Sequence, residues 1–319
     1  MKKIISLALV LIMLAAVMAG CGANNSDTYT VGICQLMVHD SLDQATKGFQ
    51  DALTEKMKEA GKSVSFDTQV AGEIDLCTTV VSTFTAKNVD LIMANATPAL
   101  QAAAAATADI PILGTSVTDY ASALEIDGFS GVCGGNISGT SDLAPLNEQA
   151  AMIVELFPDA KNVGIVYCSS EANSQYQVDV ITGYLTDLGL TVTPFSFTDT
   201  NDVASVTQAA CDASDVIYIP TDNTAAANTE AIANVVLPAQ VPVIAGEAGL
   251  CGGCGVATLS IDYYDLGYAT GEMAAKILKG EANISEMEVA YAPIVTKQYN
   301  AANCEALGVT IPDGYEPMG

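Results

Sequence analysis

The sequence contains no arginine and no tryptophan, and it has a single histidine. Its 11 basic residues are therefore all lysines, and they face 37 acidic residues, which gives a formal net charge of −26 at pH 7. A surface of this charge repels nucleic acid and anionic lipid headgroups, so neither is expected as a partner. Without arginine, an anionic ligand must be held by hydroxyls, backbone N–H groups or a helix N-terminus.

Most catalytic motifs are missing as well. His39 is the one histidine that a Ser-His-Asp triad could use, and no GxSxG motif accompanies it. The sequence has no GxxxxGK loop for phosphates, and one histidine does not make a histidine-based metal site. We therefore expect a binding protein rather than an enzyme, with no metal and no cofactor. A hydrolase on an α/β scaffold remains the alternative from another class.

The N-terminus has the features of a secretory signal. Two lysines precede an apolar run, residues 4–18, which is shorter than a membrane span and ends in small residues. The following "VMAGC" resembles a bacterial lipobox, in which the cysteine, here Cys21, is lipidated and becomes the first residue. We expect a signal peptide at residues 1–20, a tether at residues 21–28, and a lipid anchor on the extracytoplasmic face of the cell membrane. An ordinary signal peptide with a chance cysteine is the alternative.

The cysteines beyond the predicted signal do not suggest a disulfide framework. Such frameworks belong to small secreted domains that lack a core, whereas this chain is long and half hydrophobic. Most of these cysteines lie in apolar runs, where a thiol behaves as a small hydrophobe. The exception is "CGGC", from Cys251 to Cys254, for which inert thiols, a local disulfide and a metal site are open. The metal is least favoured, because a zinc site needs a second pair of ligands.

Apolar β-branched runs alternate with segments of helical periodicity along the rest of the chain. Uninterrupted apolar strands in this alternation predict parallel sheets with helices on both faces. The strands are too many for one sheet, and the alternation restarts after a glycine-rich stretch at residues 128–142. The sequence therefore predicts an α/β protein of two doubly wound parallel-sheet lobes joined by hinge strands. We place the N-terminal lobe at residues 29–141 plus about 264–285, and the C-terminal lobe at residues 142–263 plus about 290–319.

Polar side chains follow the predicted strands at the edge where an open α/β sheet binds its ligands. Ser, Thr, Asn and Asp at such places also cap the next helix, so for any single residue that interpretation is equally good. Their recurrence after five or more strands favours one shared cleft. The candidate ligand-binding residues are Gln35, His39, Thr97, Thr115, Ser116, Ser169, Ser170, Asn173, Ser174, Thr221, Asp222, Asn223, Glu247 and Asp262.

The stretch "SSEANS" offers a site for one carboxylate. Ser169 and Ser170 supply hydroxyls on a predicted turn, and the helix that follows has free N–H groups at its N-terminus. A phosphate suits this site less well, because the chain has no guanidinium to neutralise it. Asp222, Glu247 and Asp262 suit an ammonium group. A carboxylate at one end and an ammonium at the other describe an amino acid.

Several stretches also carry a resemblance to a known family, and the most specific are "SSEANS", "PTDNT" and "SIDYY". The chain resembles the substrate-binding lipoproteins of ABC transporters, of the tryptophan/tyrosine type, over about residues 29–312. The resemblance implies a periplasmic-binding-protein fold of class I that closes on a ligand between its lobes. It implies delivery of that ligand, most often an aromatic amino acid, to a membrane permease with its ATPase. It also assigns the candidate residues above to the pocket. We expect the protein to be a monomer.

Two departures from the family pattern affect the expected ligand. Asp40 stands where a proline commonly follows the histidine. In addition, "CGGC" replaces the usual loop after Glu247. The first departure leaves the ligand open, because Asp40 could face the pocket. A receptor for a sugar or another small solute is the alternative within the binding class, although sugar sites usually stack rings on Trp or Phe. Pocket aromatics in this chain could come from Tyr120, Tyr176 or Tyr263.

Overall fold

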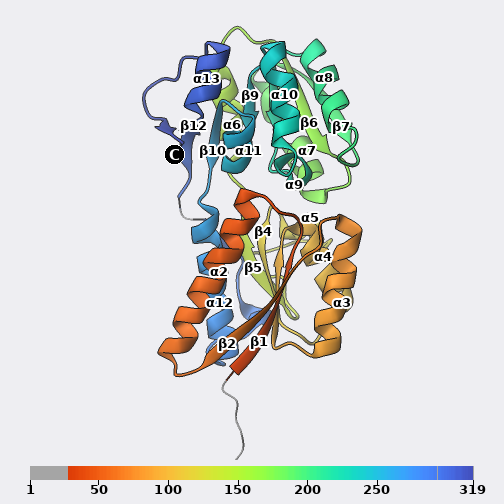
Figure 1. The fold of residues 1–319 in the computed structure, drawn as a ribbon, viewed down its shortest axis with the longest axis vertical. Coiled ribbons are helices and arrows are strands. Elements are labelled where there is room, and N and C mark those ends of the chain that lie inside the picture. The colour runs from red at the N-terminus through yellow and green to blue at the C-terminus, as the bar shows by residue number, and fades with distance from the viewer. Residues whose placement is uncertain (1–27, 293, 319) are drawn as a thin grey trace, which may run out of the picture.

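Two mainly parallel β-sheets form the framework of the protein, one in each lobe (Figure 1). The computed structural model describes residues 28–292 and 294–318. The predicted signal peptide, the lipidation site Cys21 and the tether up to residue 27 lie outside the described residues. Within the described ranges, no helix has the length and apolarity needed to span a bilayer.

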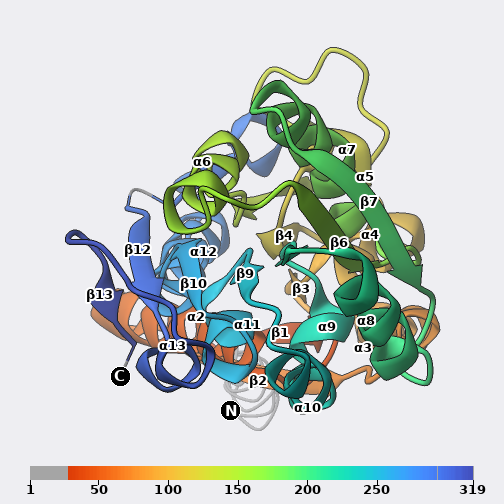
Figure 2. The same cartoon turned by 90° about the horizontal axis from the view of Figure 1, so that it is seen from above.

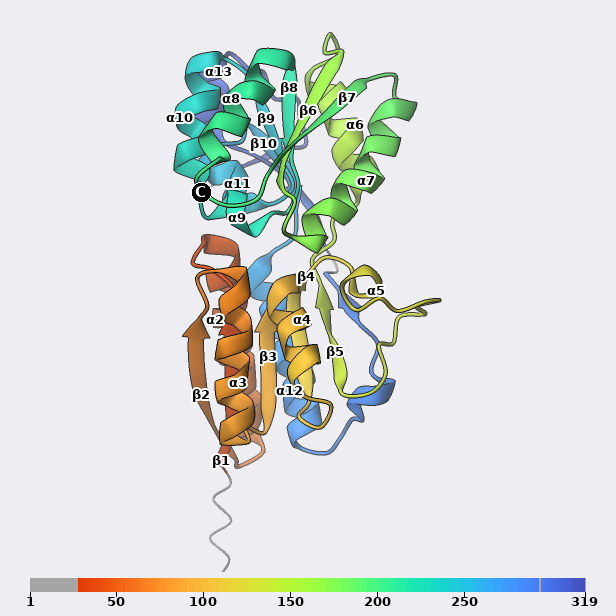
Figure 3. The same cartoon turned by 90° about the vertical axis from the view of Figure 1, so that its right-hand side faces the viewer.

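The first lobe contains a sheet of six strands in the order β11-β5-β4-β3-β1-β2, and its named pairs are all parallel. Helices cover both faces of this sheet (Figure 3). Its strands are β1 (Thr28–Gln35), β2 (Ser63–Val70), β3 (Leu91–Asn95), β4 (Ile112–Val117), β5 (Ile137–Ser141) and β11 (Ala290–Tyr291). Its helices are α2 (Asp40–Glu59), η1 (Ile74–Leu76), α3 (Cys77–Lys87), α4 (Thr97–Ala106), α5 (Tyr120–Ala123), α12 (Tyr263–Leu278) and η2 (Ile284–Glu286).

The second lobe contains a sheet of seven strands in the order β13-β12-β10-β9-β8-β6-β7, in which only the β10–β12 pair is antiparallel. Figure 2 shows this lobe from above. Its strands are β6 (Asn162–Cys168), β7 (Thr191–Phe197), β8 (Val216–Ile219), β9 (Val243–Ala245), β10 (Ala257–Ser260), β12 (Thr296–Tyr299) and β13 (Glu316–Pro317). Its helices are α6 (Leu146–Leu156), α7 (Ala172–Asp187), α8 (Val203–Ala213), α9 (Asn223–Ala226), α10 (Thr229–Ala239), α11 (Ala248–Gly253) and α13 (Ala301–Leu307).

The central strands are apolar on both faces because helices cover both sides of each sheet. Every residue of β3, β4, β8, β9 and β10 is buried. This is the pattern that parallel sheets require. The predicted α/β architecture of two doubly wound lobes is confirmed.

The chain passes between the lobes three times, after β5, before α12 and after β11. The carboxyl ends of the parallel strands in both sheets face the space between the lobes (Figures 1 and 3). Strand β11 pairs with β5 in the first sheet. The last crossing therefore lies between β11 and β12, a few residues later than the sequence boundary at about residue 290.

The glycine-rich stretch after residue 128 hides a strand that the sequence analysis missed. Strand β5 lies there. Gly139 in this strand has a φ of +147°, a backbone conformation that residues with a side chain rarely adopt. A Cβ at Gly139 would overlap the carbonyl oxygen of Gly114 and the hydroxyl of Tyr120. Glycine therefore lets β5 pair closely with β4, and the same glycine content made the segment look like a loop.

Helices α2 and α12 pack backbone against backbone on the first lobe (Figure 1). A Cβ at Gly48 would overlap the carbonyl oxygen of Tyr264, and one at Gly267 would overlap that of Ala45. The contact therefore depends on residues without side chains. Helix α2 begins at the space between the lobes, and α12 begins at a crossing. Their packing therefore fixes the position of the cleft edge relative to that crossing.

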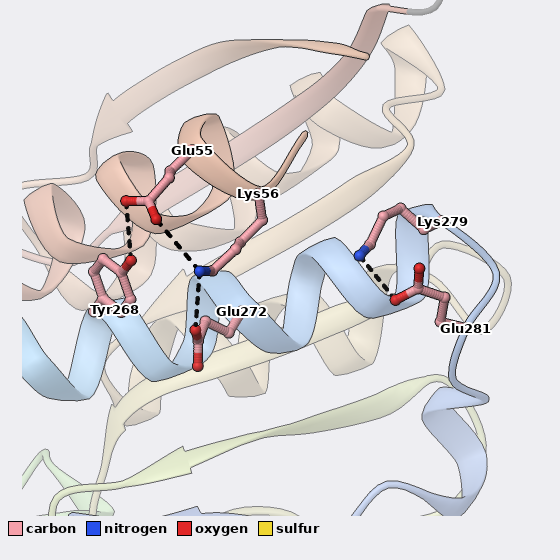
Figure 4. A network of polar contacts seen from close by, with 6 residues as sticks. All are labelled: Glu55, Lys56, Tyr268, Glu272, Lys279 and Glu281. Atoms are coloured by element: carbon pink, nitrogen blue, oxygen red, sulfur yellow. Dashed lines mark hydrogen bonds and ion pairs between the residues drawn. The ribbon is translucent and has the colours of Figure 1, made fainter. Parts of the chain in front are cut away.

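Polar contacts follow the outer side of the same helix pair (Figure 4). Lys56 Nζ lies 3.3 Å from Glu55 Oε1 and 3.6 Å from Glu272 Oε1, and the Tyr268 hydroxyl donates to Glu55 Oε2 at 3.1 Å. The acidic partners are about half exposed, so such pairs contribute at most about 1 kcal/mol each. The glycine contacts, rather than these ion pairs, hold the two helices together.

Candidate ligand-binding site

A small pocket lies between the lobes, where the carboxyl ends of both sheets meet. Its walls leave a free volume of only about 10 Å³, roughly the space of one water molecule. Both lobes and two of the crossings contribute to its wall. The lining residues are His39, Leu42, Ser116, Asp142, Thr221, Asp222, Asn223, Ala226, Glu247 and Tyr263.

Two hydrogen bonds join the lobes at this pocket. Ser41, in the first turn of α2, donates its hydroxyl hydrogen to Glu247, which caps α11 in the second lobe. His39 Nε2 lies 3.4 Å from the side-chain oxygen of Asn223. The lobes are therefore closed on one another, and the pocket is walled in from both sides.

Asp222 lines the pocket with a carboxylate that accepts three hydrogen bonds. One of its oxygens accepts from the Cys168 N–H at 2.6 Å and from the Ser174 hydroxyl at 2.7 Å, and the other accepts from the Ala225 N–H at 2.8 Å. The side chain is 1% exposed, and it caps the short helix α9. Burial and, after it, the nearby carboxylate of Glu171 together raise the pKa of Asp222 to about 7.

Glu171 lies behind Asp222 and holds the backbone that carries it. Its two carboxylate oxygens accept five hydrogen bonds, from the N–H groups of Asn223 and Thr224 and from side chains of Asn173, Asn223 and Thr224. The residue is fully buried. This carboxylate therefore fixes the segment from residue 222 to 224 against the start of α7.

Glu247 has the same arrangement at the next strand end. It follows β9, caps α11, and accepts from the N–H groups of Gly249 at 2.7 Å and Leu250 at 2.6 Å. With the Ser41 hydroxyl it has three donors, one of them from the other lobe. This carboxylate therefore belongs both to the pocket wall and to the contact between the lobes.

Asp142 lies at the first crossing and faces the pocket from the hinge. Its oxygens accept from the Thr118 hydroxyl at 3.0 Å and from the Tyr263 hydroxyl at 3.0 Å. Tyr263 begins α12 at the second crossing, so this bond links two crossings. Burial raises the pKa of Asp142 to about 6, although both hydroxyl donors act in the opposite direction.

The first lobe presents polar atoms that have no partner within the described chain. Buried atoms of this kind include the hydroxyls of Thr97 and Ser116, the side-chain oxygen of Asn95, and Nδ1 of His39. All four residues follow or end strands at the edge of the first sheet that faces the pocket. Buried polar groups are normally bonded, so unpaired ones call for an explanation such as a ligand. Ser116 and His39 line the pocket itself.

The structure brings six of the predicted site residues together at the pocket. They are His39, Ser116, Thr221, Asp222, Asn223 and Glu247. Five more are buried beside it, and all but Thr97, whose hydroxyl has no partner in the described chain, are bonded within their own lobes. Gln35 bonds Met37, Asp43 and Thr46, and Thr115 bonds Thr140. The others of this group are Thr97, Asn173 and Ser174.

Three predicted residues do not face the pocket. Ser169 and Ser170 are exposed, and their hydroxyls donate to the carbonyl oxygens of Phe197 and Thr198 at the end of β7. They therefore bond the end of a neighbouring strand and do not line the pocket, and the expected carboxylate clamp of these two serines stays a prediction that no contact of the closed lobes supports. Asp262 is exposed and caps α12 by accepting from the Asp265 N–H at 2.9 Å. These residues serve as turn and cap residues, the alternative that strand-end positions always leave open.

A second, more open cavity of about 390 Å³ lies beside the pocket, between α2, α11 and the start of α12. Asp40 and Asp262 line this cavity rather than the pocket, and both are exposed. The substitution of Asp40 for the usual proline therefore places a charge at the rim of the cleft, not against the pocket wall.

The residues of "CGGC" lie inside the second lobe. Cys251 and Cys254 are buried free thiols, and burial raises the pKa of Cys254 to about 12 and also raises that of Cys251. Such thiols are poor nucleophiles, because the thiolate is the reactive form. Among the described residues, no group of three or more His, Cys, Asp and Glu side chains is placed to hold a metal ion.

Sequence reasoning missed Glu171 and Asp142, which carry much of the electrostatics of the site. Glu171 stood inside "SSEANS", but its partners lie about 50 residues away at the start of α9. Asp142 directly follows β5, the strand that was not recognised. The signal for both was a carboxylate within three residues of the end of an apolar strand, the rule that found Asp222 and Glu247.

A comparison with protein families matches residues 30–315 to the model described as ABC transporter substrate binding protein. A relative, the tyrosine-binding protein of Clostridioides difficile (strain R20291), is 34% identical over 296 residues. That alignment covers 88% of this chain and 85% of the relative.

Two solved structures allow a comparison of shape. The ABC domain from Streptococcus pneumonia in complex with L-Trp is 32% identical, and the match covers 91% of this chain and 100% of that chain with a TM-score of 0.85. The ligand-free, open structure of a substrate-binding protein with adhesive properties from Clostridium difficile is 34% identical, and the match covers 91% and 99% of the two chains with a TM-score of 0.68. Since the identities are nearly equal, the scores show that the arrangement of lobes in this chain is closer to that of the L-Trp complex.

Proposed function

The chain belongs to the family of ABC transporter substrate-binding proteins, and we propose that it captures an aromatic amino acid in the cleft between its lobes, which opens wider than the closed pocket of this structure to hold it. The family expected from the sequence is thereby confirmed. The observation that carries the ligand proposal is the chemistry of the pocket, which has buried carboxylates on one side and unpaired hydroxyls on the other. The printed ligands of the relatives, tyrosine and L-Trp, favour the aromatic class.

The ammonium group of the ligand is proposed to face Asp222, with Asp142 and Glu247 near it. These three carboxylates line the pocket, and no lysine lines it. An ammonium in this place satisfies charges that burial otherwise penalises.

The carboxylate of the ligand is proposed to face the first lobe. The Ser116 and Thr97 hydroxyls have no partner, and Thr97 begins α4, a helix of 10 residues whose first N–H groups are free. This assignment replaces the clamp of Ser169 and Ser170. The ligand would then bridge the lobes, and closure would follow from contacts that only the closed form can make.

The side chain of the ligand is proposed to lie against Leu42, Ala226 and Tyr263, the apolar residues of the lining. A sugar receptor remains the second candidate within the binding class. A neutral sugar leaves the buried carboxylates without a counter-charge, which disfavours it. We also propose that the protein does not transform its ligand.

Binding is tested by thermal shift and calorimetry on the mature chain with L-tyrosine, L-tryptophan and L-phenylalanine. A ligand at a hundred times its dissociation constant adds about 2.7 kcal/mol to the free energy of unfolding. D-glucose and L-alanine serve as controls for the sugar class and for the aromatic ring. Stabilisation by glucose alone would overturn the proposal, and so would recovery of an altered amino acid after incubation.

The protein is proposed to be a monomer anchored by lipid on Cys21, from where it delivers its ligand to a permease with its ATPase. Substrate-binding proteins of this family act outside the cytoplasm, and an anchor keeps the receptor near the transporter. Two acyl chains suffice for stable membrane attachment. The Cys21→Ser variant should lose its partition into detergent; unchanged partition would contradict lipidation.

A further inference from the structure

The pocket is surrounded by more negative charge than one ligand ammonium requires. Asp142, Asp222 and Glu247 line it with exposures of 3%, 1% and 2%, and Glu171 lies fully buried behind Asp222. No lysine lines the pocket, and the chain has no arginine. Buried charges without counter-charges are costly. In the closed arrangement, hydrogen bonds alone must therefore stabilise these carboxylates.

The four carboxylates are not equally provided with donors. Glu171 accepts five hydrogen bonds and Glu247 accepts three. Asp222 accepts three, but it lies beside Glu171 and the two repel each other. Asp142 has only two hydroxyl donors. Asp222 and Asp142 are therefore the carboxylates that closure leaves most in need of a positive charge.

We propose that Asp142 and Asp222 form a charge lock, which allows the lobes to close only when a ligand ammonium or a proton neutralises the pocket. These two carboxylates would then determine both which solutes bind and when the lobes close. A solute without a cationic group leaves both carboxylates buried and unpaired, so it fails to hold the lobes together even where its shape fits. The ligand part of this inference rests on the proposed function; the proton part requires no ligand.

The other titratable groups that face the lock do not replace it. His39 and Tyr263 line the same pocket, and the Cys168 thiol and Glu171 lie on the second-lobe side of Asp222. Tyr263 and Cys168 have pKa values raised by burial, so they stay neutral in the range considered. His39 also lies on the pocket wall, so the variant His39→Gln separates any contribution of its side chain from that of the two carboxyls.

The sign of the pH dependence follows from the two raised pKa values. Above pH 8 both carboxyls are ionised, and closing the lobes without a cation buries two charges. As the pH falls through about 7 and then about 6, first Asp222 and then Asp142 take up a proton in the closed form. Ligand-free closure is therefore favoured at low pH, by up to about tenfold in the closed-to-open ratio per pH unit for each linked proton.

The test is small-angle scattering of the ligand-free mature protein from pH 8.5 to pH 6. The radius of gyration should fall with the pH in the parent chain and in His39→Gln. Asp142→Asn should be more compact at pH 8.5 and depend less on pH, because Thr118 and Tyr263 hydroxyls can bond an amide as well. Asp222→Asn repeats the test at the second carboxyl. The control Asp40→Asn removes an exposed charge at the cleft rim and should behave like the parent.

A radius that does not change with pH in the parent, or a control that matches Asp142→Asn, would overturn the charge lock. With ligand, tyramine should still compact the parent at pH 8.5, whereas 3-(4-hydroxyphenyl)propionate, which lacks the ammonium, should not. Compaction by that acid would also overturn it. If no aromatic amino acid binds, the proposed function fails, but the ligand-free pH series still decides on the lock.

Discussion

The two lobes meet the same pocket with opposite chemistry. The second lobe brings the carboxylates Asp222 and Glu247, and its own backbone N–H groups already bond them. The first lobe brings the hydroxyls of Thr97 and Ser116, which have no partner in the described chain. In the proposed complex, one side is therefore built before the ligand arrives, and the other side is completed by the ligand.

This difference shows how a receptor without arginine can bind a zwitterion. The negative side needs rigid support, because a buried carboxylate is stable only when donors surround it. The other side needs only neutral donors, and a hydroxyl with no intramolecular bond can turn toward a ligand without breaking one. Substitutions in the two lobes should thus fail in different ways: loss of stability in the second lobe, and loss of affinity in the first.

The largest effect is expected from Glu171→Ala in the second lobe. The substitution leaves the N–H groups of Asn223 and Thr224 buried without acceptors, and each such group costs about 1–3 kcal/mol. We expect the free energy of unfolding to fall by about 3–5 kcal/mol in denaturant titration. Glu148→Ala, an exposed glutamate on α6 of the same lobe, is the matched control and should change it by less than about 0.5 kcal/mol. Equal midpoints for the two variants would contradict the supporting role of Glu171.

An intermediate effect, on affinity alone, is expected from Ser116→Ala in the first lobe. Its hydroxyl has no partner in the described protein, so the melting temperature without ligand should not change. A lost hydrogen bond to a charged ligand group costs about 1.5–3 kcal/mol, or roughly ten- to a hundredfold in dissociation constant by calorimetry. Ser138→Ala gives the reverse control, because that buried hydroxyl donates to Met287 O at 3.0 Å and lies away from the pocket lining. If Ser116→Ala lowers the melting temperature and spares affinity, the comparison of the lobes fails.

The smallest effect is expected from Ser169→Ala and Ser170→Ala. Both hydroxyls are exposed and bond carbonyl oxygens at the end of β7, 3.2 Å away in each case. Surface substitutions of this kind change free energies by about 0.5 kcal/mol or less. Calorimetry should therefore give dissociation constants within about threefold of the parent. A tenfold loss in either variant would restore the serine clamp predicted from the sequence.

The architecture was largely readable from the sequence because buried parallel strands leave long apolar runs. Strands β3 and β4, whose residues are all buried, are examples. Strand β5 was not predicted because glycine is typical both of loops and of places where two backbones approach closely. At Gly139 it marks a close approach between strands rather than a loop, and only the position of Tyr120 and Gly114 reveals which meaning applies.

The site was readable only in part, because a strand-end position does not say which way a side chain turns. Asp222 and Ser170 both follow second-lobe strands, yet one caps α9 beside the pocket and the other bonds the end of β7. Glu171 shows a second limit. Its importance comes from donors on a helix far along the chain, and neither spacing nor composition encodes that meeting.

The glycine contacts between α2 and α12 have a mechanical consequence. They join α2, which begins at the pocket, and α12, which begins at the crossing, into one rigid unit. Helix α2 alone, with 20 residues at about 1.5 Å each, is about 30 Å long. A rotation of about 15° about the pocket end would carry the far end of that helix through roughly 8 Å. A small displacement at Ser41 thus becomes a displacement of several ångströms at the far end of α2. A pair of fluorescent dyes placed there and on the second lobe would report it as a change in their distance.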